Sequence, residues 1–514
     1  MTTSGTPSRA GRIRASAFRS GRRGWERRLA PLSPFDGSNR RRGAGRLSIA
    51  SNRLPVTLEP DWDGEWSMSS ASGGLVTALD PVLRRRRGIW TGWAGTPDAG
   101  QEELSRALGR KPGRPPYSLQ AVPLSAQEED LFYRGFANEV LWPLFHGFPD
   151  RWNPEPRYWE AYRTVNRRFA RSLASTAGWD DLIWVHDYHL MLAGKELRAL
   201  GSKHRLAFFL HIPFPPFQLL ERMPWAGELV EGLCHFDLLG FQTSGSRDNF
   251  LDAARHIVPD AFSHGSVDGH PFFRGREIRT GAFPISIDAT EFSAAAHGPV
   301  VVAMEREIRK SLGGRTLMLG VDRLDYSKGI PEKLRGFDLA LDKYPELRGS
   351  VLLKQLVVPS RDQIPAYRET KREIERLARS INERWGTDAW QPVEYLYDSW
   401  GRSDLLAHYR SADVALVTPL NDGMNLVAKE YAVANQGSGV IILSAFAGAA
   451  AELGSNALLV DPCEPDSVAT TLLCAFRMPL LERKERMARA EATVRTHDVH
   501  GWVEDVLAEG MRAG

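Results

Sequence analysis

Several apolar runs in this sequence end in histidine and aspartate residues that could bind a polar ligand. The run Ile183–Val185 leads into His186–His189, of sequence HDYH, and Phe208–Leu210 leads into His211 and a proline-rich turn. Ligands of open α/β sheets bind beyond the carboxyl ends of the strands, so these side chains are expected to face a site. The favoured interpretation is hydrogen bonding to a polyhydroxylated ligand. A structural role is one alternative, and a metal site is another, although the rest of a metal ligand set is missing.

Basic residues follow two apolar runs in the second half of the chain. Leu317–Val321 is followed by Arg323 and Lys328, five residues apart in a turn that leads towards a helix, and Val351–Val358 is followed by Arg361. A planar guanidinium and a compact ammonium could together neutralise a diphosphate. A solvated turn is the alternative for Arg323 and Lys328.

The segment Thr418–Tyr431, of sequence TPLNDGMNLVAKEY, is the most specific local arrangement in the chain. Gly423 and Asn425 suit a turn and the start of a helix, and Asp422 and Glu430 lie eight residues apart. Free N–H groups at the start of this helix could bind phosphate oxygens, and Glu430 could reach ribose hydroxyls two turns later. A capped helix with only a structural role is the alternative.

A glycine pair, Gly73 and Gly74, precedes a helical pattern and could let a phosphate or a sugar approach the backbone closely. By itself such a pair is more often a simple turn. No Gly-x-Gly-x-x-Gly follows a strand, and no Walker lysine motif is present. The sequence therefore argues against a nicotinamide-dependent dehydrogenase and against a P-loop ATPase.

The elements that must position these residues are short apolar strands that alternate with longer helical patterns. Most strands are continuous apolar runs, as expected when both faces of a parallel sheet are buried. The predicted strands are Leu47–Ser51, Ile89–Trp93, Leu182–Val185, Leu206–Leu210, Leu238–Phe241, Gly281–Ile285, Thr316–Val321, Val351–Val358, Val414–Val417, Val440–Leu443 and Ala457–Val460. The predicted helices include Pro154–Ser175, Ala366–Trp385, Ser403–Ser411 and the final helices within Leu480–Arg512. Two such series predict an α/β fold of two doubly wound domains, with a hinge near Pro284–Ala303.

The composition is that of an ordinary globular protein, with 514 residues, 42% of them hydrophobic and 25% charged. This length suggests two or three domains. The three cysteines form no Cys-x-x-Cys pair, so neither a disulfide framework nor a zinc site is expected, and a reducing compartment, the cytoplasm, fits best. The longest apolar stretch, around Val440–Leu453, is interrupted by Ser444 and is too short to span a membrane.

The net charge of +3 is unevenly distributed. Residues 1–46 hold twelve arginines and only two acidic residues, Glu26 and Asp36, so this basic arm carries +10 and the rest of the chain carries −7. We expect the arm to be a disordered extension or the product of a misplaced start codon, and an organelle transit peptide is the alternative. No nucleic-acid or membrane partner is expected for the folded part.

At these motifs the chain resembles the bacterial trehalose-6-phosphate synthases. The resemblance runs from about Leu47 to about residue 505, and its motifs keep one order along the chain: Ser51–Pro55, Gly73–Leu75, Leu141–Pro143, His186–Leu190, His211–Pro215, Arg323–Gly329 and Asp422–Tyr431. It implies a GT-B fold, in which two Rossmann-like domains face a central cleft. It also implies a retaining glycosyltransferase that moves glucose from a nucleotide-glucose, UDP-glucose by default, to glucose 6-phosphate, without a metal or another cofactor. The products would be trehalose 6-phosphate and a nucleoside diphosphate.

The resemblance also implies a role for each matching residue. Asp187 and His211 would hydrogen-bond the two sugars and, with Arg323 and Lys328 at the diphosphate, form the catalytic set. The remaining donor-binding residues would be Gly73, Gly74, Trp400 at the nucleobase, Asp422, Asn425, Leu426, Val427, Ala428, Lys429 and, at the ribose, Glu430. The acceptor would be held by Arg53, Tyr133, Trp142, Asp187 and Arg361, with Trp142 packed on the sugar and the two arginines on the phosphate.

Some expectations stay open at this point. Asn421 stands where many relatives have arginine, so the donor nucleotide could be UDP, GDP or ADP. A glucosylglycerol-phosphate synthase that uses glycerol 3-phosphate and a catalytically silent sugar-phosphate sensor are the rival functions, and a homo-oligomer is possible. The expected domain bounds are 1–46 for the arm, 47–285 for the acceptor domain, 286–490 for the nucleotide-sugar domain and 491–514 for a C-terminal helix that could pack back on the acceptor domain.

Overall fold

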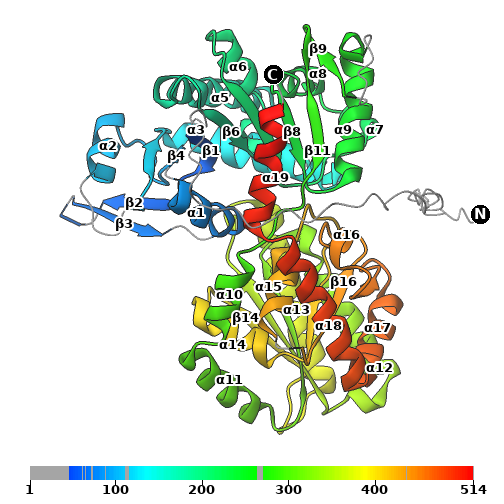
Figure 1. Cartoon of the computed structure of the whole chain (residues 1–514). Coiled ribbons are helices and arrows are strands. Elements are labelled where there is room, and N and C mark those ends of the chain that lie inside the picture. Colours follow the sequence, from blue (N-terminus) through cyan, green and yellow to red (C-terminus); the bar gives the residue numbers. More distant parts are fainter. Residues whose placement is uncertain are drawn as a thin grey trace, which may run out of the picture. The chain divides into compact units, whose positions relative to one another are not determined.

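The computed structural model describes residues 46–60, 62–63, 65–70, 73–86, 88–109, 115–262, 270–435 and 437–512. The predicted arm, 1–46, lies outside these residues except for Arg46. Residues 44–514 form one compact unit, within which the strands build two large parallel sheets (Figure 1). We call the parts of the chain around them the first and the second domain.

The first sheet has seven strands, all parallel, in the order β11-β8-β7-β6-β1-β4-β5. Its strands are β1 (Leu47–Arg53), β4 (Ile89–Trp93), β5 (Ser118–Ala121), β6 (Leu182–His186), β7 (Arg205–Leu210), β8 (Leu238–Phe241) and β11 (Arg279–Ala282). Two antiparallel pairs stand apart from it: β2 (Val56–Pro60) with β3 (Trp66–Ser70), and β9 (Phe272–Phe273) with β10 (Arg276–Glu277).

The second sheet has six parallel strands in the order β14-β13-β12-β15-β16-β17. They are β12 (Thr316–Arg323), β13 (Val351–Val358), β14 (Val393–Tyr397), β15 (Val414–Val417), β16 (Val440–Ser444) and β17 (Leu458–Val460). In both sheets the strand order reverses beside the first strand, between β1 and β6 and between β12 and β15. Ligands of doubly wound folds bind at such switch points, so the ends of these four strands are where a site is expected.

Helices connect the strands in both domains. The first domain contains α1 (Gly74–Arg86), α2 (Gln101–Gly109), α3 (Ala126–Glu128), η1 (Glu129–Leu141), α4 (Trp142–Phe145), η2 (Pro149–Arg151), α5 (Pro156–Thr176), η3 (Tyr188–Leu190), α6 (Ala193–Ala199), α7 (Phe217–Leu220), α8 (Ala226–Leu233), α9 (Ser244–Ile257) and η4 (Pro259–Phe262). Helices α5 and α9 pack directly on its sheet. Unlike the others, η1 is a π-helix, a rare form that is frequent at functional sites.

The second domain contains α10 (Ala289–Ala296), α11 (Pro299–Leu312), η5 (Tyr326–Lys328), α12 (Ile330–Lys343), η6 (Pro345–Leu347), α13 (Pro365–Trp385), α14 (Arg402–Ser411), α15 (Leu426–Ala434), α16 (Ala450–Leu453), α17 (Pro465–Arg477) and α18 (Leu480–Thr496). Proline at the first position of α5, α11, α13 and α17 explains why these helices begin where they do, since proline has no N–H to leave unbonded.

The predicted strands agree with the structure except at weakly apolar edges. The edge strands β5 and β14 were not among the predictions, because Ser118–Ala121 is short and polar and Val393–Tyr397 is only partly buried. The predicted strand Gly281–Ile285 has the wrong bounds: β11 runs from Arg279 to Ala282, and Pro284, which has no N–H to donate, follows outside the ladder. Within the predicted hinge, residues 284–288 and the turn at 297–298 lack regular structure, and α10 and α11 occupy the rest.

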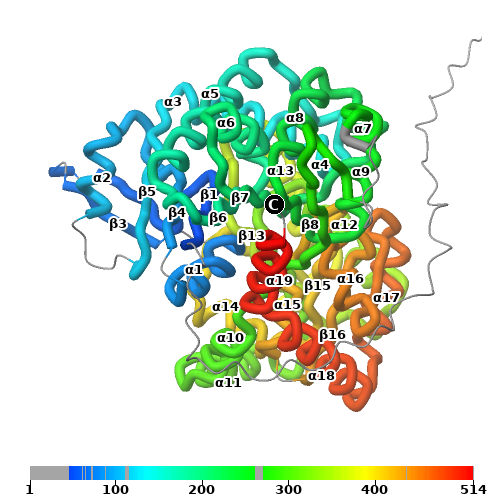
Figure 2. The backbone as a smooth tube through the Cα atoms, turned by 45° about the horizontal axis from the view of Figure 1, so that its top comes forward, coloured from blue at the N-terminus to red at the C-terminus, as the bar shows by residue number. Residues whose placement is uncertain are grey.

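The last helix, α19 (Val499–Arg512), contacts α1, β7 and β8 of the first domain, although it follows α18 of the second (Figure 2). The Trp502 indole N–H donates to the Phe283 carbonyl at 3.0 Å, and its ring lies 5.1 Å from those of Trp184 and Phe209. The residue bounds that separate the domains stay a prediction. Within the described part of the chain, no helix has the length and apolar content needed to cross a membrane.

Candidate functional site

The switch points bring basic and acidic side chains to one place. Arg53 ends β1, and Asp187 follows β6, the neighbouring strand. Asp187 adopts a φ of 74°, a left-handed conformation that is uncommon outside glycine. In the second sheet, Arg323 ends β12, and Arg361, with a φ of 54°, follows β13. Strained backbone at two strand ends is consistent with side chains aimed for function rather than for packing.

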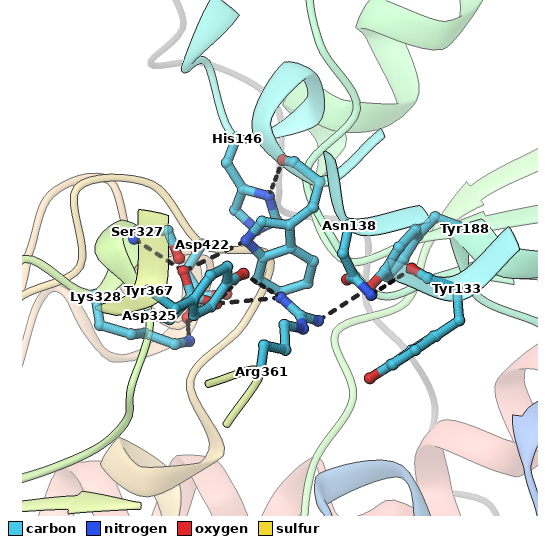
Figure 3. Close-up of polar contacts among 11 residues, drawn as sticks. Tyr133, Asn138, His146, Tyr188, Asp325, Ser327, Lys328, Arg361, Tyr367 and Asp422 are labelled. Carbon is cyan, nitrogen blue, oxygen red and sulfur yellow. Dashed lines mark hydrogen bonds and ion pairs between the residues drawn. The ribbon is translucent and has the colours of Figure 1, made fainter. Parts of the chain in front are cut away.

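Arg361 is held by groups from both domains (Figure 3). Its guanidinium donates to the Tyr367 hydroxyl at 2.5 Å, to the Asp325 carboxylate at 3.4 Å and to the Tyr188 hydroxyl of the first domain at 3.1 Å. Its side chain is only 7% exposed, and its Nε has no hydrogen-bond partner among the described residues. These contacts use three of the five N–H groups of the guanidinium, and a buried cation with unused donors fits an anion that arrives with the substrate.

Two further arginines lie near Arg361 without a carboxylate partner in the described part of the chain. Arg53 lies over the rings of Trp93, 4.4 Å away, and Tyr133, 5.9 Å away, and Arg323 lies 5.8 Å from the ring of Trp142. Although burial opposes it, the three guanidinium groups together hold the pKa of the Tyr133 hydroxyl below its ordinary value. The site is therefore strongly positive before any ligand binds.

Trp142 supports this cationic group. Its ring is 4% exposed and lies 4.1 Å from the Arg361 guanidinium and 4.1 Å from the ring of His146, and its N–H is 3.4 Å from Asp325. In this arrangement the guanidinium groups of Arg361 and Arg323 pack on the indole ring. A direct contact between Trp142 and a sugar stays a prediction.

The second cationic group is centred on Lys328. Its ammonium pairs with the Asp422 carboxylate, which also accepts from the Asn425 side chain at 2.7 Å. Despite burial, the Lys328 ammonium and the nearby His146 and Arg323 keep the pKa of Asp422 below its ordinary value. Helix α15 begins directly after Asn425, at Leu426, so its first N–H groups, those of Leu426 and Val427, lie beside this ion pair.

Three predicted donor-binding residues are engaged within the protein. The Glu430 carboxylate accepts from the Tyr409 hydroxyl at 2.8 Å. Lys429 is 1% exposed at its side chain and bonds to Glu452 and to the carbonyl of Ile285, so only its backbone could face a donor. The ring of Trp400 stacks on His408 at 3.9 Å, just after β14.

Two glycines allow the domains to approach closely. A Cβ at Gly74 would lie 3.0 Å from the Leu426 side chain, and a Cβ at Gly423 would overlap the carbonyl oxygen of His211. Gly73, with a φ of 147°, immediately precedes α1, which agrees with the prediction that the glycine pair opens a helix.

Asp187 and His211, from adjacent strand ends, are joined through the backbone. The His211 N–H donates to the Asp187 carboxylate at 3.3 Å. Burial raises the pKa of Asp187 to about 6, against the opposing effect of the Tyr188 and His211 N–H groups and of Arg361. Burial lowers the pKa of His211 to about 3, so its ring is neutral at pH 7.

The structure adds residues that sequence reasoning missed. Asp325, Tyr188 and Tyr367 hold Arg361, and Asn421 donates from the second domain to the His146 carbonyl of the first at 3.1 Å. The motifs contained Tyr188, Asp325 and Asn421, but only the tertiary contacts assign these roles. Among the described residues, no three His, Cys, Asp or Glu side chains are grouped as a metal ion would require.

The chain is similar to known proteins over most of its length. The profile of Glycosyltransferase family 20 matches residues 45–511. The "Trehalose-6-phosphate synthase" of Mycolicibacterium smegmatis is 40% identical over 483 residues, which cover 93% of this chain and 94% of that protein, and the Mycobacterium tuberculosis protein of the same name is 40% identical over 472 residues, 90% and 94% of the two chains.

Two solved structures are similar over nearly the whole chain. An E. coli structure bound with UDP-2-fluoro glucose matches with a TM-score of 0.82 and 35% identity over 90% of this chain and 98% of that one. An alpha,alpha-trehalose-phosphate synthase (UDP-forming) from Burkholderia xenovorans in complex with glucose-6-phosphate matches with a TM-score of 0.81 and 37% identity over 91% and 100%.

Proposed function

This chain belongs to glycosyltransferase family 20, and on that premise we propose that it transfers glucose from a nucleotide-glucose to glucose 6-phosphate. The products are alpha,alpha-trehalose 6-phosphate and a nucleoside diphosphate. The observation that carries this proposal is that Arg361 and Lys328, both beyond the carboxyl ends of strands in the second sheet, pair with different carboxylates, Asp325 and Asp422, and so form two cationic groups. Two anionic substrates need two such groups, and one group would serve a single anion.

We assign the group of Arg361 to the acceptor phosphate. Arg361 and Arg53, with the hydroxyl of Tyr133, can place donors around a phosphate dianion, and the three side chains are close enough for the arginines to depress the pKa of Tyr133. Arg53 and Tyr133 come from the first domain, so acceptor binding draws the domains together.

We assign the second group to the donor diphosphate. Arg323 is close enough to influence the pKa of both Tyr133 and Asp422. We place it with Lys328 and the first N–H groups of α15, at the charge that develops on the departing nucleoside diphosphate. In the free enzyme, Asp422 neutralises Lys328, so a bound diphosphate would compete with this carboxylate for the ammonium. Stabilisation of the leaving group by preorganised donors is the main catalytic effect that the site can supply.

We propose same-face transfer with retention. The bond between the glucose C1 and the diphosphate oxygen breaks, and the bond from C1 to the attacking hydroxyl oxygen of the acceptor forms on the same face. The hydroxyl proton passes to the departing phosphate oxygen. Asp187 and the His211 segment orient the sugars for this step, which positioning of the two reactants accelerates.

The test is a matrix of purified enzyme with UDP-, GDP- or ADP-glucose and either glucose 6-phosphate or glycerol 3-phosphate, with the products identified by mass. We expect trehalose 6-phosphate, with UDP-glucose as the best donor. Product with glycerol 3-phosphate alone would replace the acceptor assignment, and no nucleoside diphosphate from any pair would favour a sugar-phosphate sensor. A trapped covalent glucosyl-enzyme would exclude the same-face step.

A cytoplasmic setting is supported by three free cysteines, Cys234, Cys463 and Cys474. Association into a homo-oligomer can be checked by light scattering of the enzyme used in the matrix.

A further inference from the structure

The side chain of Gln242 links the segment between the domains to His211. Gln242 follows β8 and is 2% exposed. Its Oε1 accepts from the backbone N–H of Ile285 at 2.9 Å, within residues 283–288 that lead into the second domain. Its Nε2 lies 3.2 Å from Nδ1 of His211. The Ile285 N–H can only donate, so it identifies Oε1 as the acceptor end of the amide and Nε2 as the donor end.

This orientation determines where the proton of His211 lies. Because the Gln242 amide donates to Nδ1, this nitrogen must be the acceptor of a neutral ring, and the single proton is on Nε2. Nε2 lies 3.1 Å from Nδ1 of His186, which must therefore accept it. The result is a directional chain of hydrogen bonds from Gln242 through His211 to His186.

The surroundings hold the ring of His211 in this orientation. The Phe209 ring lies 4.8 Å from it, and the Trp502 ring of α19 lies 6.4 Å from it and 6.5 Å from His186. His186 is fully buried, and its Nε2 has no partner among the described residues. No second arrangement of the three side chains would satisfy both ends of the Gln242 amide.

The same backbone residue also reaches the donor helix. The carbonyl of Ile285 accepts from the Lys429 ammonium of α15 at 2.9 Å, and Lys429 pairs with Glu452 at 2.5 Å. Ile285 is thus bonded on one side to Gln242 and on the other to the residue before Glu430. The backbone of this one residue therefore connects α15, through Gln242, to the ring of His211.

We propose that Gln242 is a positioning residue of the glycosyl transfer: it sets the Nε2–H tautomer of His211 and ties the position of this residue to the interdomain segment at Ile285. The inference rests on the proposed function for its kinetic consequence, but the tautomer can be measured without turnover.

The test uses the isosteric variant Gln242→Glu in the full-length enzyme. The carboxylate still accepts from the Ile285 N–H but cannot donate to His211, so Nδ1 of His211 must carry the proton instead. In ¹⁵N-detected histidine spectra, with His211→Asn for assignment, we expect Nδ1 of His211 to be unprotonated in the wild type and protonated in Gln242→Glu. Protonated Nδ1 in the wild type would overturn the proposal.

Kinetics give the second readout. We expect kcat to fall at least tenfold in Gln242→Glu. The KM for the acceptor should change less than threefold, because the variant leaves the cationic group around Arg361, which we assign to the acceptor phosphate, unchanged. The matched control is Gln120→Glu on β5 of the same sheet, which is expected to leave kcat unchanged. Among the described residues, the Gln120 amide donates to the Ala121 carbonyl alone. An unchanged kcat in Gln242→Glu would remove the positioning role. An enzyme without any transfer activity, but with the expected spectra, would instead reject the proposed function and leave the tautomer assignment standing.

Discussion

At the scale of single residues, the site is built from charges that depend on one another across the two domains. Arg361 is bonded to Asp325 and Tyr367 of its own domain and to Tyr188 of the other. Lys328 has its own carboxylate, Asp422. A carboxylate therefore neutralises each buried cation in the free enzyme, and each cation still has N–H groups that can donate to a ligand. Such a site can bind an anion and release it without leaving a buried charge unpaired.

Removal of Arg361 should weaken the acceptor selectively. In Arg361→Ala we expect the KM for glucose 6-phosphate to rise roughly ten- to hundredfold, because charge-assisted hydrogen bonds to a dianion are worth about 1.5–3 kcal/mol. Donor binding, measured by titration with the nucleoside diphosphate, should change little. Arg151→Ala is the matched control, since Arg151 also lies over a ring, that of Tyr326, at 4.8 Å. Equal weakening of both substrates would contradict the assignment.

The raised pKa of Asp187 predicts a pH-dependent effect on stability. A pKa of about 6 in the folded state, raised by burial above the ordinary value, means that folding favours the protonated carboxyl. This contribution is fully present below about pH 4 and is lost as the pH rises through about 6. At about 1.4 kcal/mol per unit of pKa, the ionised carboxylate costs at most about 3 kcal/mol at pH 8.

The variant Asp187→Asn, which cannot ionise, isolates this effect. We expect its free energy of unfolding, relative to the wild type, to increase between pH 4 and pH 7 and to level off above, as measured by urea denaturation at each pH. A difference that is constant over this range would show that the carboxyl is not destabilised by folding. The same variant should lose most of its glycosyl transfer.

At the scale of elements, the strand ends and helix starts bring the site together. Strands β1, β6, β12 and β15 all end at switch points, and the continuous apolar runs that form them were predictable because both faces of a parallel sheet are buried. Edge strands such as β14 were not, since exposure on one side removes the apolar pattern. The contact of one domain with the other depends on how closely their loops can approach.

Gly423→Ala tests this close approach. The backbone of Gly423 does not need a left-handed conformation, so the obstacle is the overlap of a Cβ with the backbone of His211 and Ile212. We expect kcat/KM to fall at least a hundredfold, since the domains must separate at this point, while the thermal midpoint changes by only a few degrees. Gly245→Ala in α9, where a Cβ meets nothing within 4 Å, should retain full activity. An active Gly423→Ala enzyme would contradict the arrangement of the two loops.

The contact of α19 with the first domain can be tested in the same way. Trp502 is 3% exposed and packs against Trp184 and Phe209. Trp502→Ala should lower the free energy of unfolding by about 3–5 kcal/mol. The matched control is Trp179→Ala, because Trp179 is 89% exposed and should change stability by less than about 0.5 kcal/mol. A similar stability for both variants would show that α19 does not contribute to the core.

At the scale of the whole molecule, the uneven charge does not indicate where the site lies. The family match spans residues 45–511, and every predicted site residue lies within 53–430. The part of the chain after residue 46 carries −7 and still presents two cationic groups, because local placement outweighs the total.

Deletion of residues 1–45 should therefore leave the enzyme intact. The deletion retains Arg46, whose N–H donates to Asp181 at 2.8 Å and whose carbonyl accepts from Leu182, so β1 and β6 stay paired at their start. We expect kcat, both KM values and the thermal midpoint to match those of the full chain. A tenfold loss of kcat would show that the arm takes part in the reaction.

Most strands of the two large sheets, the two doubly wound domains and the identity of most charged residues in the site could be predicted from the amino-acid sequence alone. These features are local, since buried strands, helix starts and motif residues are written in short stretches of chain. Which of these residues contact each other is visible only in the folded structure. The Tyr188 and Asp325 contacts of Arg361, the place of Lys429 beside Ile285 and the tautomer of His211 depend on side chains that lie far apart in the sequence. A buried polar group must find its partner in space, and no spacing along the chain specifies where that partner lies.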